Sequence, residues 1–351
     1  MCKMKHIGTI IIMALLALTP LKTFAGHGEE PAGEMNISEI VLEHLSDSYE
    51  WHIASYEGKH LSIPLPIIVR SAQTGEWTVC TPHNLPSNFY FDQEHHGKIY
   101  ERMADGTTQR PLDLSITKAV AQIWIVVAVL LAVFLSCSRW YKKRDEKSNA
   151  PRGFVGAVEM LVMYIHDDLI RPSVGEKHYK KYAPYLLTVF FFILTTNLVG
   201  LLPVFPGGTN VTGNINVTLF LAVCTMLAIN LFGNKEYWKE IFWPEVPLFL
   251  KAYPVPVMPV IELFGVFTKP FALMIRLFAN MMAGHAFMLS FTCVIFLGWS
   301  MGVGFGIGLN AFSVVMLLFM NCLELLVAFV QAYVFTMLSA VFIGLAHKEE
   351  H

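Results

Sequence analysis

The sequence predicts an all-α polytopic membrane protein: five membrane-crossing helices and one amphipathic helix, preceded by a small β-rich or mixed domain. Of its 351 residues, 54% are hydrophobic and only 15% are charged. This composition excludes a disordered chain and argues against an ordinary soluble enzyme. Uncharged apolar stretches of about twenty residues or more recur after residue 119, and each is long enough to cross a ~30 Å hydrocarbon core. Residues 26–118 contain no such stretch.

Charge and motif content bound the class of function. The formal net charge is −2 and the sequence has no basic stripe, so no nucleic-acid partner is expected. The six cysteines lack the spacing of metal sites. A Gly-rich phosphate loop ending in Gly-Lys-Ser/Thr does not occur. We therefore expect no metal, nucleotide or other cofactor.

Residues 1–25 have the form of a secretory signal peptide. Lys3 and Lys5 precede the apolar run 7–18, and small residues follow it. An uncleaved first helix is the alternative. Either form would carry residues 26–118 across the membrane.

Residues 26–118 predict a periplasmic N-terminal extension. Alternating apolar and polar residues at 61–70 and 76–79 are typical of short strands, so we expect a small β-rich domain. It holds no catalytic constellation. His95 and His96 stand beside two acidic residues, and we interpret them as part of a solvated loop rather than a metal site.

The first span is predicted at residues 119–138, and an amphipathic helix follows it. The basic residues directly after the span are Arg139, Lys142, Lys143, Arg144 and Lys147. By the positive-inside rule that flank is cytoplasmic, which leaves the N-terminal extension outside. Within residues 153–170, apolar side chains recur every three or four positions: Phe154, Val158, Leu161, Ile165 and Leu169. We expect this helix to lie on the cytoplasmic surface or to pack against the other helices.

Four more spans complete the membrane domain, residues 119–351, and they are predicted at 183–203, 215–232, 260–297 and 310–346. A glycine-rich turn at 298–309 separates the last two. As one helix the final span would be about 55 Å long, and ordinary tilts of about 20° cannot fit it into a ~30 Å core. The last two spans are therefore predicted to form a steeply tilted hairpin. Five crossings put the tail after residue 346 in the cytoplasm.

Arg276 is the most informative residue of the membrane domain. It lies in the otherwise uncharged stretch 271–298, where a guanidinium costs about 2.5 to 3.5 kcal/mol by the mildest insertion scales. No acid or second base follows it in this stretch except His285. A structural explanation is an arginine that snorkels to the interface or pairs with an acid on a neighbouring helix. Otherwise its counter-charge is distant in this chain or belongs to another chain.

The first helix of the predicted hairpin carries further polar residues. At 100° per residue, Glu262, Lys269 and Arg276 fall on one side, and Asn280 follows one turn later. His285 projects toward the opposite side. Glu262 and Lys269 are nearer the cytoplasmic start of the helix, so an interfacial position is the alternative for both.

The second helix of the hairpin supplies Glu324 and Gln331, which are seven residues apart and share a side. In an antiparallel hairpin, Gln331 would lie near the level of Arg276 and Glu324 near that of His285. Gln331 and Asn280 are also suited to plain interhelical hydrogen bonding. Glu324 and His285 could form a static buried pair, or they could pass protons.

Two segments of the hairpin strongly resemble the signature of subunit a of the F-type ATP synthase. They read KPFALMIRLFANMMAGH at 269–285 and LLVAFVQAYVF at 325–335. Supporting likenesses are Asn197 to Pro203, Asn214 to Thr218, and Glu262 seven residues before Lys269. The resemblance covers about 119–351. Residues 1–118 lie outside it, although some bacterial members carry an enlarged periplasmic N-terminal region.

The resemblance implies that Arg276 faces a rotating ring of c subunits. Each rotor carboxylate would release its proton near this fixed cation, because a nearby positive charge favours the ionised form. The same charge would block leakage between two offset aqueous half-channels. The implied partners are the c-ring, the b subunits and the rest of the complex.

The resemblance also implies a proton pathway. It would comprise Asn214, Glu262, Asn280, His285, Glu324 and Gln331. Gln331 would neighbour Arg276, while His285 and Glu324 would line the periplasmic half-channel. Many bacterial relatives carry the acid and the histidine in the reverse positions, so this chain has the pair exchanged.

Two other classes of function fit the sequence less well. A secondary transporter would use Arg276 to bind an anionic substrate, but such folds show internal repeats that are not evident here. A structural membrane scaffold leaves the cost of an isolated arginine unexplained. The sequence therefore favours a non-catalytic, ion-translocating subunit of an enzyme complex in a bacterial inner membrane.

Overall fold

The computed structural model describes residues 47–56, 59–92, 97–103, 107–143, 151–202, 207–242, 257–300 and 303–347. The predicted signal peptide and the His95-His96 pair lie outside these residues. The chain divides into two compact units. One comprises Met1–Ile125, Leu198–Val211 and Gly284–Cys322, and the other comprises Val126–Asn197, Thr212–Ala283 and Leu323–His351.

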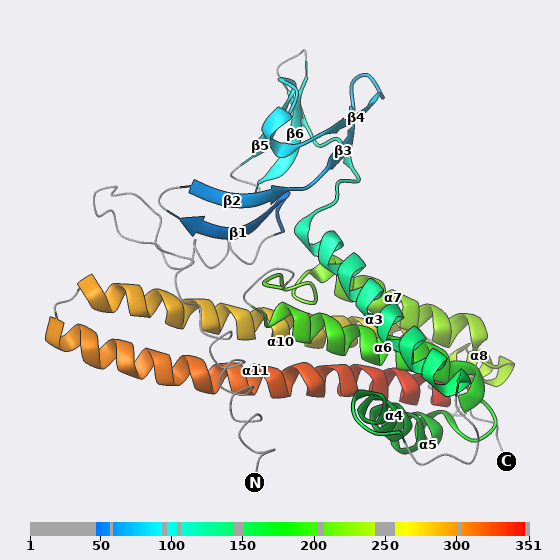
Figure 1. Ribbon diagram of the computed structural model, residues 1–351. Coiled ribbons are helices and arrows are strands. Elements are labelled where there is room, and N and C mark those ends of the chain that lie inside the picture. Colours follow the sequence, from blue (N-terminus) through cyan, green and yellow to red (C-terminus); the bar gives the residue numbers. More distant parts are fainter. Residues whose placement is uncertain are drawn as a thin grey trace, which may run out of the picture. The chain divides into compact units, whose positions relative to one another are not determined.

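The first unit contains the strand region, which confirms the predicted β-rich extension (Figure 1). Its elements are β1 (Glu50–Tyr56), β2 (Lys59–Pro64), β3 (Ile67–Arg70), β4 (Trp77–Cys80), the short helix η1 (Pro82–Asn84), β5 (Phe89–Asp92), β6 (Lys98–Arg102), β7 (Thr108–Gln109) and β8 (Leu112–Asp113). They form an antiparallel pair β1-β2 and two three-stranded sheets, β4-β3-β8 and β5-β6-β7.

Alternating side chains give the strand region its own core. Ile67 and Val69, on one face of β3, are 0% exposed and pack with Tyr49, Phe89 and Ile99. This is the period-2 pattern expected of a sheet with one buried face. The other face of β3 lies outside that core.

The membrane domain is helical. Its elements are α3 (Lys118–Lys142), α4 (Phe154–Tyr164), the π-helical turns η2 (Ile165–Ile170), α5 (Arg171–Val174), α6 (Tyr179–Gly200), α7 (Ile215–Phe232), α8 (Lys235–Phe242), α10 (Val257–Ser300) and α11 (Val303–Leu345). Among the described residues, five helices are long and apolar enough to cross a membrane, as predicted: α3, α6, α7, α10 and α11. The last two run side by side as an antiparallel hairpin (Figure 1).

The glycine-rich turn predicted at 298–309 contains the point where α10 gives way to α11, but its predicted extent is too long. Most of it is helical, because α10 continues to Ser300 and α11 begins at Val303. A backbone in hydrocarbon must satisfy its own polar groups, so glycines there remain helical despite their low propensity. At 1.5 Å per residue each helix is about 65 Å long, roughly twice a ~30 Å core.

The amphipathic helix is only partly as predicted. Ile165 and Leu169 are 0% and 2% exposed and join the core of the second unit, but Phe154 is 66% exposed. Phe154 is the first residue of α4, and burial of the apolar row increases along the helix: Val158 and Leu161 are half-buried and Ile165 is fully buried.

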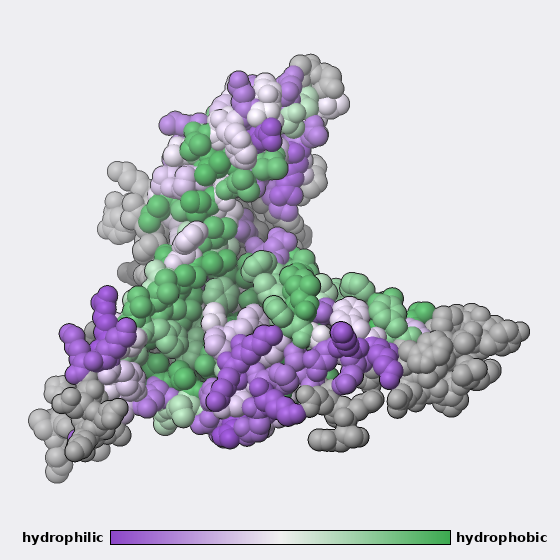
Figure 2. Space-filling model, turned by 90° about the vertical axis from the view of Figure 1, so that its right-hand side faces the viewer, coloured by the Kyte–Doolittle hydropathy of each residue, from purple (hydrophilic) through white to green (hydrophobic). Residues whose placement is uncertain are grey.

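The second unit has a core built by α6, α7, α10 and α11. Its fully buried members include Leu186, Phe190, Ile193, Leu277, Met281 and Ile343. Gly344 of α11 is required by close packing, because a Cβ there would collide with the carbonyl of Ser173 in α5. Outside this core, large apolar side chains face outward, and Figure 2 shows such residues over the helices. Leu231 at 70% exposed and Phe220 at 67% are examples, as expected of helices surrounded by lipid.

Candidate functional site

Helix α10 buries one face and thereby turns Arg276 outward. Leu273, Leu277 and Met281 recur every four residues, are at most 2% exposed and belong to the core of the second unit. Arg276 is offset from this row by about 60 to 100°. Its side chain is exposed on the surface of the chain.

Small residues surround Arg276 on this outward face. Ala272, Ala279, Asn280 and Ala283 stand one or two turns away, and all four are exposed. Such short side chains let a second helix approach closely. The face therefore suits a partner helix that brings its own group toward the guanidinium.

Within the described part of the chain, no carboxylate lies within the 4.0 Å ion-pair distance of the Arg276 guanidinium. Lys269, two turns earlier, has a different environment. It is half-buried, and its Nζ lies 5.8 Å from the centroid of the Phe342 ring in α11. The two cations predicted to share a side thus differ in exposure, and Pro270 lies inside the helix between them. Arg276 is the cation that stays open to another chain.

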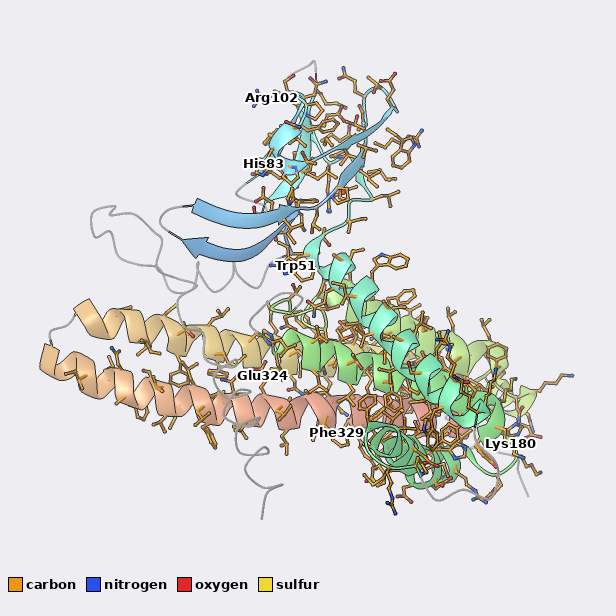
Figure 3. The ribbon with its side chains drawn as sticks, in the orientation of Figure 1. Trp51, His83, Arg102, Lys180, Glu324 and Phe329 are labelled. Atoms are coloured by element: carbon orange, nitrogen blue, oxygen red, sulfur yellow. The ribbon has the colours of Figure 1, made fainter. Side chains whose placement is uncertain are left out.

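Helix α11 supplies the buried polar residues Glu324 and Gln331, which are 4% and 7% exposed. Figure 3 shows Glu324 on α11, ahead of Phe329. The contact between Lys269 and Phe342 fixes the register of the two helices in the second unit. Arg276 is seven residues after Lys269, and Phe335 is seven residues before Phe342, so Phe335 lies near the level of Arg276. Gln331 is four residues from Phe335, which is about one turn.

The remaining predicted residues occupy three different environments. His285 and Glu262 are half-buried on α10, and Glu262 lies about 21 Å along the helix from Arg276 at 1.5 Å per residue. Together with burial, the charge of Glu262 raises the pKa of the Tyr237 phenol in α8. The side chain of Asn214 caps α7 by accepting from the backbone N–H of Asn216 at 3.0 Å. That His285 and Glu324 form one layer stays a prediction, because they belong to different units.

Asn197 is a residue whose contacts the sequence did not reveal. It is 4% exposed near the end of α6. Its Nδ2 donates to the carbonyl oxygen of Ala328 in α11 at 3.4 Å, and its Oδ1 accepts from the Thr212 hydroxyl at 2.7 Å. Ala328 is one turn from Gln331, so Asn197 helps to position that stretch of α11. A lone amide in an apolar span was the available signal.

A chain of buried hydroxyls also links three helices. The Thr225 hydroxyl of α7 lies 3.1 Å from the Tyr185 hydroxyl of α6 and 3.3 Å from the Ser339 hydroxyl of α11. Thr225 and Ser339 are 0% exposed. These contacts hold the helices that position the hairpin, and no spacing in the sequence predicted them.

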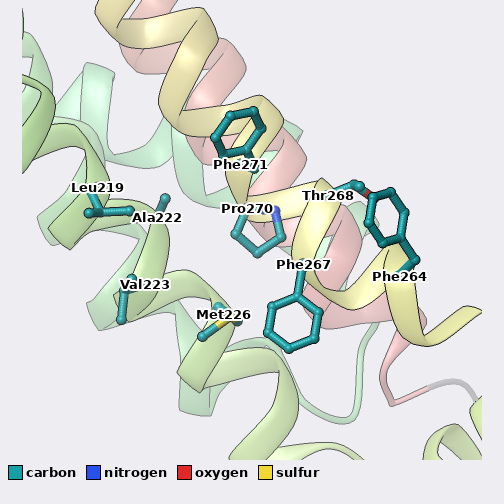
Figure 4. A pocket seen from close by; sticks show the side chains of 9 residues that line it. All are labelled: Leu219, Ala222, Val223, Met226, Phe264, Phe267, Thr268, Pro270 and Phe271. Carbon is teal, nitrogen blue, oxygen red and sulfur yellow. The ribbon is translucent and has the colours of Figure 1, made fainter.

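The second unit also contains a cavity, which is separate from this polar chemistry. Its volume is about 420 Å³, and it lies between α7 and α10 (Figure 4). The lining residues are Leu219, Ala222, Val223, Met226, Phe264, Phe267, Thr268, Pro270 and Phe271. The Thr268 hydroxyl already donates to the Gly265 carbonyl at 3.3 Å. A cavity without charged or titratable lining groups is unsuited to conduct ions.

Taken together, these residues form a fixed cation on a helix face of small, uncharged residues, with a buried glutamine about one turn away. A guanidinium keeps its proton at all physiological pH values, so it cannot itself relay protons. It can bind an anionic group from another chain, and it can lower the pKa of an approaching carboxylic acid.

A family model and several known proteins similar to this chain indicate the same family. A family model described as ATP synthase A chain matches residues 120–344, and one described as a domain of unknown function (DUF8433) matches residues 40–115. The chain is 43% identical over 275 residues to an ATP synthase subunit a of Chlorobium phaeobacteroides (strain DSM 266 / SMG 266 / 2430), covering 77% of this chain and 75% of the relative. It is 37% identical to that of Chlorobium phaeobacteroides (strain BS1), covering 98% and 96%. For the subunit a of Anaeromyxobacter dehalogenans (strain 2CP-C) the identity is 36%, covering 93% and 81%.

Proposed function

Because the chain belongs to the ATP synthase A chain family, we propose that Arg276 is the fixed charge through which it couples ion flow to rotation. The chain serves as the stator a subunit of the membrane sector, in a complex with a c-ring and b subunits. A secondary transporter is not favoured, since the family match spans most of the membrane domain.

One observation carries the proposal: Arg276 is exposed on a face of small residues and has no carboxylate partner in the described part of the chain. Such a charge is costly in lipid. A carboxylate on a passing c subunit would supply the missing counter-charge. The buried row Leu273, Leu277 and Met281 anchors α10 and so keeps the backbone at Arg276 in place while the rotor moves.

The chemistry follows from the two charges. A protonated rotor carboxylic acid that approaches Arg276 loses its proton, because the guanidinium stabilises the carboxylate. When the rotor carries that group back into lipid, it must take up a proton again. The permanent cation repels protons at the point where two half-channels would otherwise join, so ions cross only with rotation.

Several polar residues of the hairpin are proposed to serve the half-channels. Gln331 lies about one turn from the level of Arg276, and Asn280 shares its exposed face. His285 and Glu324 are assigned to the periplasmic half-channel, in which one titratable acid and one imidazole can exchange protons. Glu262 would serve the cytoplasmic side. The structure gives Asn214 a capping contact, and its part in the pathway is proposed from the family likeness.

The proposed sidedness rests on charge. Arg139, Lys142 and Lys143 follow the apolar part of α3, and such clusters remain in the cytoplasm. The strand region is therefore periplasmic and the end of α11 is cytoplasmic, in a bacterial inner membrane.

The test is ATP-driven proton pumping in inverted membrane vesicles. Arg276→Ala should abolish pumping. The subunit should still copurify with the c-ring, because the Arg276 side chain forms no ion pair within the part of its own chain that the structure describes. Arg171→Ala is the matched control. Arg171 is an exposed arginine of α5 whose Nε donates to Glu176 at 2.8 Å, so its loss should leave pumping intact. Pumping retained by Arg276→Ala would reject the proposal.

A further inference from the structure

The strand region has an apolar face that its own core does not cover. It belongs to the sheet β4-β3-β8, whose other face buries Ile67 and Val69. Its exposed members are Trp77 at 53%, Val79 at 71%, Leu112 at 54% and Leu114 at 60%. In the space-filling view, apolar residues are visible at the surface of the strand region as well as over the helices (Figure 2).

The strand register arranges this face in two rows across the sheet. Arg70 pairs with Trp77 on one side and with Leu112 on the other. Ile68 pairs with Val79, and it accepts a hydrogen bond from the backbone N–H of Leu114 at 2.9 Å. We refer to these six residues as the outer face: Ile68, Arg70, Trp77, Val79, Leu112 and Leu114. Contiguous apolar groups of this kind on a folded domain mark an interaction surface.

The chain ties the outer face to the start of a membrane span. Leu114 is four residues before α3, a distance of at most about 14 Å for an extended chain. Hydrogen bonds within the first unit hold this connection: Ile116 N–H donates to the Pro66 carbonyl at 3.1 Å, and Lys118 N–H donates to the Ser48 carbonyl at 3.0 Å. The outer face therefore stays close to the level at which α3 enters the bilayer.

The lipid-exposed surface of α3 begins directly after this connection. Val120 and Trp124 are 36% and 68% exposed in its first two turns. Exposed apolar residues therefore occur both on the outer face, up to Leu114, and in the first two turns of α3, a span that faces lipid. A water-exposed apolar face this near the membrane boundary would be an unusual arrangement.

The composition of the outer face fits a phospholipid surface. Tryptophan concentrates at the membrane interface, where its ring is in the apolar region and its N–H stays hydrated. The Arg70 guanidinium lies 5.9 Å from the Trp77 ring centroid, and its Nε donates to the Gly75 carbonyl at 2.9 Å. Its remaining N–H groups can bind a headgroup phosphate, which guanidinium geometry favours.

We propose that the outer face of the β4-β3-β8 sheet docks on the phospholipid headgroup region of the leaflet that α3 enters, with Val79, Leu112 and Leu114 in the apolar boundary and Arg70 on phosphate. This inference rests on the membrane placement of α3 and is independent of Arg276. Docking would hold the strand region against the bilayer beside the first span.

The test places a small fluorescent amino acid at Val79 in the complete complex, reconstituted into phospholipid vesicles. Because Val79 is 71% exposed, the replacement leaves the core of the strand region intact. Thr108, an exposed residue of β7 in the other three-stranded sheet, receives the same probe as the matched control. Quenching is measured with aqueous iodide and with nitroxide-labelled lipid.

If the outer face docks on lipid, iodide should quench the probe at position 79 less than the probe at position 108. Nitroxide-labelled lipid should quench the probe at position 79 more than the probe at position 108. Iodide quenching equal at the two positions would show a face open to water and would overturn the proposal. Protection at 79 from both quenchers would show a protein partner and would also overturn it. Neither result would change the pumping expected of Arg276.

Discussion

The small residues around Arg276 give the sharpest prediction. Replacing Ala279 by leucine adds three carbons to the exposed face of α10 and leaves its buried row unchanged. Contact distances between helix axes range from about 8 to 10 Å with side-chain size, so the rotor helix should be displaced by about 2 Å. Increasing the charge separation from about 4 to 6 Å weakens the attraction from about 4.2 to about 2.8 kcal/mol at an effective dielectric constant of about 20. A loss of about 1.4 kcal/mol of attraction corresponds to a factor of about ten in the equilibrium constant for pairing the two charges.

Ala279→Leu should therefore slow ATP-driven proton pumping about tenfold, given that each 1.4 kcal/mol is a factor of ten, with the amount of assembled complex unchanged. Ala157→Leu is the control, because Ala157 is an exposed alanine of α4 outside the hairpin, and it should pump normally. The assay is the initial rate of acidification in inverted vesicles, normalised to ATP hydrolysis. Equal rates for Ala279→Leu and Ala157→Leu would refute the close approach of a rotor helix to this face.

Three further predictions concern other parts of the chain. Thr225→Val should lower unfolding stability in detergent by about 1 to 3 kcal/mol through two interhelical hydrogen bonds, whereas Thr218→Val, whose hydroxyl bonds only within its own helix, should change it little; equal effects would contradict the role of the hydroxyl chain. Glu324→Gln should slow proton flux in a pH-dependent manner, because the amide cannot titrate, and a flux unchanged across pH would count against the half-channel role. Burial and the hydrogen bond to Asp113 raise the pKa of the Tyr49 phenol above its ordinary value of 10, so the stability it contributes is present below pH 10 and is lost as pH rises further. Tyr49→Phe should remove that alkaline loss in unfolding curves of the complete chain, and an unchanged pH dependence would exclude Tyr49 as its source.

Hydropathy was sufficient to predict the five spans, since each is a long apolar segment whose signal is contained within itself. Their ends were less predictable. The glycines after residue 300 were interpreted as a turn, yet the apolar environment keeps them helical in α11. The exposed position of Phe154, the first residue of α4, was not predictable either, because apolar spacing does not show how much of a helix packs against the core.

The site was only partly predictable. An isolated Arg276 is evident from the sequence alone, because no acid stands near it along the chain. Its outward orientation depends on the packing of Leu273, Leu277 and Met281, which only the assembled core shows. Contacts such as that from Asn197 to the carbonyl of Ala328 join residues 131 positions apart. No local spacing encodes a partner at that separation.

The most direct test of the central claim is oxidative cross-linking in the intact complex between Ala279→Cys and a cysteine placed one turn from the buried carboxylate of the c subunit. The account predicts a disulfide between the two subunits that forms readily and stops rotation, while Ala157→Cys gives none. A complex in which Ala279→Cys fails to reach the c subunit, although Arg276 remains essential for pumping, would contradict the assignment of this face to the rotor.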